Sequence, residues 1–208
     1  MPLQYLNGVN KGEVVLWHIT ESEHVLAGLL APVNCPPNIA NPQKRLEWMA
    51  GRLLLRHLAG ASGLDYHGIE KDGFGKPFLK NHHHHISLSH SYPYVAAQLS
   101  PARPVGIDIE QPKEKLLRIA PRILDKTELE NAGANITKHC IYWCAKEALY
   151  KIYGKRGLLF THHLKLQPFE LHEKGELLGW IETDGHRLYA ELQYLVAPEY
   201  VLVYSKTS

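Results

Sequence analysis

The order of the predicted elements constrains this chain most, because strands and helices follow one another without regular strand–helix–strand alternation. Regular alternation builds parallel sheets, whereas neighbouring short strands favour antiparallel pairing. The sequence therefore predicts an α+β fold with a mainly antiparallel sheet. The predicted strands are residues 13–19, 86–91, 94–99, 105–110, 163–170, 177–183, 187–195 and 200–204.

Two helices are predicted from apolar residues spaced three and four positions apart. The first covers residues 42–59, where Asn41 suits the N-cap, Pro42 the first helical position and Gly60 the C-terminal stop. The second covers residues 137–153. A turn at Asp184 and Gly185 is expected between two of the late strands.

The chain has 208 residues and a formal charge of +2. Pro101 and Pro104 indicate a boundary near residue 100, which gives an N-terminal half of residues 1–100 and a C-terminal half of residues 101–208. The first half holds 8 basic and 7 acidic residues and the second 15 and 14, so neither is a charged arm. This balance argues against an extended nucleic-acid or membrane surface.

Cysteine usage and the absence of long apolar runs indicate the compartment. Cys35, Cys140 and Cys144 are too few for a disulfide framework and predict reduced thiols in a cytoplasmic protein. Residues 1–5 show no charged leader, and no run of about 18 apolar residues occurs, so neither export nor a membrane span is expected. The run His82–His85 is interpreted as a solvated loop, with a transition-metal site as the alternative.

Two carboxylates share one face of the predicted strand 105–110. Side chains alternate across a strand, so Asp108 and Glu110 lie on the same side as Gly106, about 7 Å apart at the backbone. A divalent cation such as Mg²⁺ is one way to keep both ionised. The alternative is the solvated side of an amphipathic strand.

Glu147 and Lys151 lie four residues apart on one flank of the second predicted helix. They could add a third carboxylate and a cation to a centre that binds phosphate and metal. Alternatively, they form an ordinary helix-stabilising pair worth a few tenths of a kcal/mol.

Several further segments could contact phosphate. Ser87, Ser89 and Ser91 form one face of a strand, and with His90 they could bind phosphate or form a nucleophilic pair, although no Gly-x-Ser-x-Gly elbow surrounds them. Alternatively, the serine hydroxyls have no role in binding and form hydrogen bonds to neighbouring strands. Residues 71–80 predict a turn or loop.

Two other cationic features remain open at this point. Gly75, Lys76 and Pro77 lack the spacing of a phosphate-binding P-loop. On the first helix, Arg45, Arg52 and Arg56 fall within about 40° of one another and form either a basic edge or a solvated face.

Taken in order, these segments resemble a known family. An Arg-bearing helix, Gly-Lys-Pro, Ser-His-Ser, Gly-Ile-Asp-Ile-Glu and Trp-Cys-Ala-Lys-Glu-Ala-Leu-Tyr-Lys occur over about residues 41–160. Together they resemble the 4′-phosphopantetheinyl transferases of the longer, pseudo-dimeric type. Those enzymes serve carrier domains of nonribosomal peptide, polyketide, fatty acid and lysine pathways.

The resemblance implies roles for matching residues. Asp108, Glu110 and Glu147 would bind Mg²⁺, Asp108 and Lys151 would face the phosphate chain of coenzyme A, and Glu147 and Lys151 would be catalytic. The nucleotide and its 3′-phosphate would be bound by Arg52, Gly75, Lys76, Pro77, Ser89 and His90. The proton acceptor would be Glu147 or a metal-bound water.

The resemblance also implies a fold and a reaction. Two similar α+β halves would be related by pseudo-twofold symmetry, with the site between them, in a monomer. The expected reaction is Mg²⁺-dependent transfer of phosphopantetheine from coenzyme A to a serine of an apo acyl or peptidyl carrier protein. The alternatives are a Mg²⁺-dependent phosphohydrolase and a non-enzymatic carrier-binding module. Ser87 stands where the family often has Asn, and the glycine-rich stretch after the signature helix is one residue longer than expected.

Overall fold

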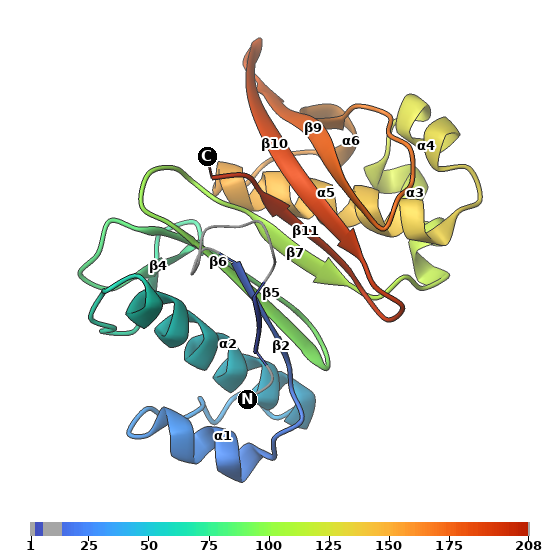
Figure 1. Ribbon diagram of the computed structural model, residues 1–208. Helices are drawn as coiled ribbons and strands as arrows, with labels where there is room; N and C mark the ends of the chain where they lie inside the picture. The colour runs from blue at the N-terminus through green and yellow to red at the C-terminus, as the bar shows by residue number, and fades with distance from the viewer. Residues whose placement is uncertain (1–2, 6–13, 208) are drawn as a thin grey trace. The chain divides into compact units, whose positions relative to one another are not determined.

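The computed structural model in Figure 1 describes residues 3–5 and 14–207. The chain divides into two compact units, Met1–Arg103 and Pro104–Ser208. Each unit has one antiparallel sheet with its own helices and apolar core, so the predicted α+β class is confirmed. Residue 13, which begins the first predicted strand, and residues 1–2 of the segment searched for a leader lie outside the described residues.

The first unit is a six-stranded sheet in the order β1-β2-β6-β5-β4-β3, and α2 packs on it, mainly against β6. Its elements are β1 (Leu3–Tyr5), β2 (Val14–His18), α1 (Glu23–Leu30), α2 (Pro42–Ala61), β3 (Ile69–Lys71), β4 (Pro77–Leu79), β5 (His85–Ser91) and β6 (Tyr94–Ser100).

The start of α2 follows its sequence signals, whereas its end does not. The Asn41 side chain accepts a hydrogen bond from the Lys44 N–H at 3.1 Å, and Pro42 occupies the first helical position, as predicted. The helix continues through Gly60, so the predicted stop there is wrong. The Ser62 N–H instead donates to the Leu58 carbonyl at 3.1 Å and closes the last turn.

The second unit is a five-stranded sheet in the order β7-β11-β10-β9-β8, with α5 packed against β11 and β7 (Figure 1). Its elements are β7 (Ile107–Glu110), α3 (Lys115–Ile123), α4 (Lys126–Ala132), α5 (Ile136–Tyr153), α6 (Phe160–His163), β8 (Leu164–Leu166), β9 (Lys174–Thr183), β10 (His186–Val196) and β11 (Val201–Ser205).

The structure differs from the sequence prediction in several further segments. Within the predicted strand 163–170, His163 ends a helical turn, and its Nδ1 accepts a 2.7 Å hydrogen bond from the Leu159 N–H. The predicted loop 71–80 is a hairpin, in which the Asp72 carboxylate accepts the N–H groups of Phe74 and Lys76 at 2.9 Å. The helices α1, α3 and α4 were not predicted.

No helix within residues 3–5 and 14–207 is long and apolar enough to cross a membrane.

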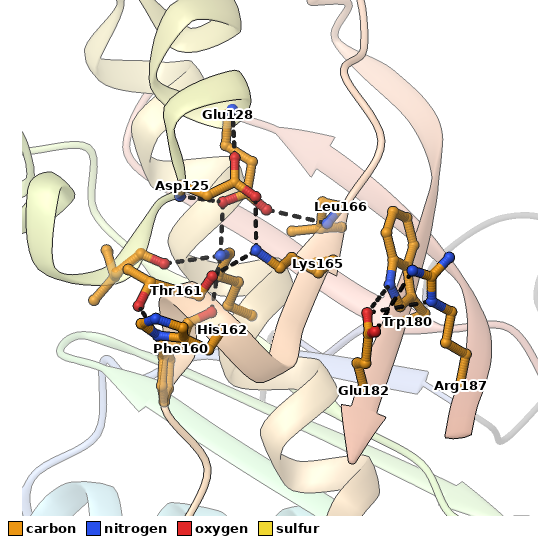
Figure 2. A network of polar contacts seen from close by, with 12 residues as sticks. Asp125, Glu128, Phe160, Thr161, His162, Lys165, Leu166, Trp180, Glu182 and Arg187 are labelled. Carbon is orange, nitrogen blue, oxygen red and sulfur yellow. Dashed lines mark hydrogen bonds and ion pairs between the residues drawn. The ribbon is translucent and has the colours of Figure 1, made fainter. Parts of the chain in front are cut away.

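A buried ion pair anchors α5 in the second unit. Lys146 Nζ lies 2.6 Å from Glu128 Oε2, and their side chains are 0% and 1% exposed. The ammonium also donates to the carbonyls of Ile123 and Phe160, at 2.8 and 3.1 Å. Figure 2 shows Glu128 reaching the N–H of Leu166, which donates to it at 3.1 Å. One charge pair therefore ties α5 to α3, α4, α6 and β8.

Burial opposes the charged form of both partners. It lowers the pKa of Lys146 and raises the pKa of Glu128, while their mutual attraction and hydrogen bonds act the other way in each case. Either group left alone would be an uncompensated charge in an apolar setting, which costs far more than a surface charge.

We expect Lys146→Met to lower the free energy of unfolding by about 3–5 kcal/mol, because Glu128 would keep a buried carboxylate without its cation. Urea denaturation followed by circular dichroism measures the loss. Lys126→Met is the matched control, since Lys126 pairs with Glu130 at 3.8 Å on the exposed surface and should contribute under about 1 kcal/mol. Equal, small losses in both variants would contradict the structural role of Lys146.

Candidate functional site

Gly106, directly before β7, allows this strand to approach α5 closely. A Cβ placed on Gly106 would lie 2.0 Å from the carbonyl oxygen of Ala148 in α5. No larger side chain fits there unless the strand or the helix moves. Because β7 and α5 are in contact through this point, the polar residues of the two signature motifs lie close together.

Asp108 and Lys151 connect the strand to the helix. The Lys151 ammonium donates to Asp108 Oδ1 and to the Ile107 carbonyl, both at 2.7 Å. Asp108 is 5% exposed, so the interpretation of this face as the solvated side of a strand is wrong for Asp108. The ion pair of Lys151 joins α5 to β7 through Asp108, whereas the helix-stabilising alternative placed its partner, Glu147, within the same helix.

Glu147 is a partly buried carboxyl group on the same side of α5. Burial raises its pKa to about 7, the negative charge of Asp108 adds to the rise, and Glu110 contributes further. Lys151 acts in the opposite direction. The structure thus brings Asp108, Glu110, Glu147 and Lys151 into one electrostatic group.

The described part of the chain holds no gathered set of three or more His, Cys, Asp or Glu side chains at metal-binding positions. The chemistry of the β7 and α5 residues nevertheless suits a hard cation, because the three candidate ligands, Asp108, Glu110 and Glu147, are all carboxylates. Burial is the main cause of the raised pKa of Glu147, and the repulsion by Asp108 and Glu110 that adds to the rise is the kind that a divalent cation relieves.

A separate cavity of about 660 Å³ lies in the first unit, against α2 and the β3–β5 strands. Of the predicted nucleotide-binding residues, Arg52, Gly75, Pro77 and His90 line it. Gly75 has a φ of +92°, a conformation that favours glycine, in the turn between β3 and β4.

The structure separates the three arginines of α2. Arg45 pairs with Glu23 of α1 at 2.6 Å, and Arg56 donates to the Leu29 carbonyl at 2.9 Å. Arg52 alone among the three lines the cavity, and its guanidinium lies 3.5 Å from the centroid of the Trp48 ring. Of the three arginines of α2, Arg52 is therefore the one placed to contact a ligand in this cavity. The three do not act together as one basic edge.

Lys76 and Ser89 are not among the residues that line this cavity. Burial lowers the pKa of Lys76, which follows Gly75 in the turn. Ser89 is buried and precedes His90 on β5, so the two side chains face opposite sides of the sheet.

The histidine run and the cysteines of α5 lie outside both groups of site residues. His82 to His84 form a loop before β5, with His82 Nε2 at 2.6 Å from the Asp65 carbonyl oxygen. Cys140 and Cys144 are buried in the apolar core of the second unit.

Four charged or aromatic residues of the cavity were not identified from the sequence, namely Lys44, Glu47, Trp48 and Lys71. Lys44 and Glu47 lie one helical turn apart, which is the usual spacing of an ion pair on the surface of a helix. Their place beside β5 could not be recognised without the packing of α2 on the sheet.

Comparison with known proteins identifies a matching family model and two similar curated proteins. Residues 104–204 match the family model of the 4′-phosphopantetheinyl transferase superfamily. A 4′-phosphopantetheinyl transferase of Bacillus subtilis is 32% identical over 148 residues, which cover 66% of this chain and 63% of that protein. The 4′-phosphopantetheinyl transferase psf-1 of Bacillus pumilus is 33% identical over 116 residues, 51% of this chain and 49% of that protein.

The matched segment contains both signature motifs and all of β7 and α5. The second unit of this chain therefore matches the 4′-phosphopantetheinyl transferase superfamily, the family that the sequence resembles, and both curated relatives carry that name. The alignments span about half to two thirds of the length of these curated relatives.

We expect Gly106→Ala to lower the free energy of unfolding by about 1–3 kcal/mol or more, because the added methyl group must displace the backbone of α5. Gly28→Ala is the matched control. No atom lies within 4 Å of a Cβ placed on Gly28 in α1, so alanine should be neutral or stabilise by up to about 1 kcal/mol. Urea unfolding of both variants measures the difference, and unchanged stability of Gly106→Ala would refute the close packing of β7 and α5.

Proposed function

We propose that the protein transfers the 4′-phosphopantetheine group of coenzyme A to a serine of an apo carrier protein. The observation that carries this proposal is the grouping of Asp108, Glu110, Glu147 and Lys151 where β7 packs on α5. That grouping lies within the residues that match the superfamily.

Asp108, Glu110 and Glu147 are the proposed ligands of Mg²⁺. A bound Mg²⁺ would stabilise the negative charge that develops on the phosphate oxygens during transfer. Lys151 supplies a second positive charge from the side of α5, and its bond to Asp108 fixes its position before a substrate arrives.

The cavity of the first unit is the proposed site for the nucleotide of coenzyme A. Its cationic lining residues include Arg52 and Lys71, which complement phosphate, and the ring of Trp48 provides a flat surface. We assign Arg52, Gly75, Pro77 and His90 to this site. Lys76 and Ser89 remain proposed contacts on the strength of the family resemblance.

In the proposed reaction, the serine Oγ attacks the β-phosphorus of coenzyme A and forms a new phosphoester bond. The bond between that phosphorus and the bridging oxygen breaks, and adenosine 3′,5′-bisphosphate leaves with the electron pair. The serine proton goes to an acceptor, for which Glu147 is the proposed residue.

The proposed setting is a monomer in the cytoplasm. This proposal rests on cysteine content, because three cysteines are too few for the disulfide framework of a secreted domain.

Incubation with coenzyme A, Mg²⁺ and several apo carrier domains should add one phosphopantetheine to a carrier serine, seen by mass spectrometry. Adenosine 3′,5′-bisphosphate should appear in equal amount, and a chelator should stop the reaction until Mg²⁺ is restored. Free phosphate without carrier modification would indicate a phosphohydrolase instead. Carrier binding without any mass gain would indicate a binding module.

Asp108→Asn and Glu147→Gln should each lower the transfer rate by about 100-fold or more, because each removes one charge from the proposed cation site while keeping its shape. The same mass-spectrometric assay measures the rates. Glu130→Gln on the exposed surface of α4 makes the same kind of change away from β7 and should be neutral. Near-normal Mg²⁺-dependent transfer by either site variant would exclude this assignment.

A further inference from the structure

The cavity of the first unit contains one carboxylate among its basic side chains. Glu47 of α2 lines the cavity together with Lys44, Arg52, Lys71 and His90. Its side chain is almost completely buried, at 3% exposure. A buried carboxylate in a cavity suited to an anion is unexpected, because its charge repels the ligand and its desolvation is costly.

The contacts of Glu47 explain how it is accommodated. Its Oε1 accepts a 3.1 Å hydrogen bond from the Tyr92 N–H, between β5 and β6. Its Oε2 lies 2.7 Å from Lys44 Nζ and 3.2 Å from His90 Nδ1. Both oxygen atoms therefore face groups of the protein, and one of them meets two potential cations at once.

These two cations differ from Glu47 in exposure. The side chains of Lys44 and His90 are 57% and 41% exposed, whereas the carboxylate between them is buried. An imidazole whose Nδ1 faces a carboxylate is oriented by that contact, and the His90 ring is part of the cavity lining. The ammonium of Lys44 keeps donors for a ligand.

We propose that Glu47 is a positioning residue of the nucleotide site, which orients His90 and Lys44 toward a phosphate group without touching the ligand itself. The inference rests on the proposed function, since it assumes that this cavity binds the nucleotide of coenzyme A. It adds a residue outside the two signature motifs and explains why an acidic residue lies in a phosphate site.

Glu47→Gln separates this role from a structural one. Its amide oxygen can still accept the Tyr92 N–H, so the link between α2 and the β5–β6 connection is kept. Its amide nitrogen carries no negative charge and cannot accept hydrogen bonds, so the charge interactions with Lys44 and His90 are lost. Glu47→Asp keeps the charge on a shorter side chain and serves as the rescue variant.

The test is calorimetric titration with adenosine 3′,5′-bisphosphate, which needs neither a carrier nor turnover. We expect Glu47→Gln to weaken binding about tenfold, the size of effect typical of hydrogen bonds to charged groups, with an unfolding midpoint close to that of the unmodified protein. Glu47→Asp should recover part of the loss. In the transfer assay, the KM for coenzyme A should rise by a similar factor while kcat changes less than about twofold.

Glu70→Gln is the matched control, because Glu70 of β3 pairs with Lys80 on the exposed surface of the same unit and should leave binding unchanged. Unchanged binding by Glu47→Gln would overturn the inference alone. The inference would also be overturned if Glu47→Gln and Glu47→Asp weakened binding equally and both lowered the unfolding midpoint. That result would indicate that Glu47 only supports the structure. Failure of the unmodified protein to bind the bisphosphate would overturn the proposed function and this inference together.

Discussion

The close approach of β7 to α5 is the constraint on which the candidate catalytic group depends. Gly106 permits it, since any side chain there would meet the Ala148 carbonyl. The contact places carboxylates from a strand and a helix within reach of one another's charge, and Lys151 bridges the two elements through Asp108. Without this packing, the two signature motifs would be an ordinary strand and an ordinary helix.

The signature helix combines two different uses of neighbouring charged residues. Lys146 is fully buried and pairs with Glu128, so it belongs to the packing of the second unit. Glu147, the next residue, lies on the flank of α5 that faces the other carboxylates. A buried ion pair costs desolvation energy, and its value lies in fixing one arrangement of helices rather than in added stability. Here it fixes the helix that carries the proposed catalytic residues.

Much of the fold could be predicted from local patterns, and much of the site could not. Asn41 and Pro42 correctly located the start of α2, and strand alternation located β5, β6 and β7 to within two residues. The end of α2 was missed because Gly60 is exposed and tolerated within the helix. Alternation put Asp108 on a polar face but gave no measure of its burial, which depends on how α5 packs.

The cavity of the first unit shows the same limit. The sequence pattern places Arg45 and Arg52 on one flank of a helix, so it does not show which of them lines the cavity, although the family resemblance implies Arg52. The choice follows from Glu23 on α1, which pairs with Arg45, and from Trp48, on which Arg52 lies. The local signal at Glu47 is its helical spacing from Lys44, which resembles an ordinary surface pair, because its other partners His90 and Tyr92 are more than forty residues away along the chain.

The central claim is that β7 and α5 together form one cation site that supports phosphoryl chemistry. Electron paramagnetic resonance of Mn²⁺, used as a substitute for Mg²⁺ in the presence of coenzyme A, tests it most directly. The account predicts saturable Mn²⁺ binding by the unmodified protein that is strongly weakened both by Asp108→Asn on the strand and by Glu147→Gln on the helix. Binding that survives unchanged in either variant would contradict a site shared by the two elements.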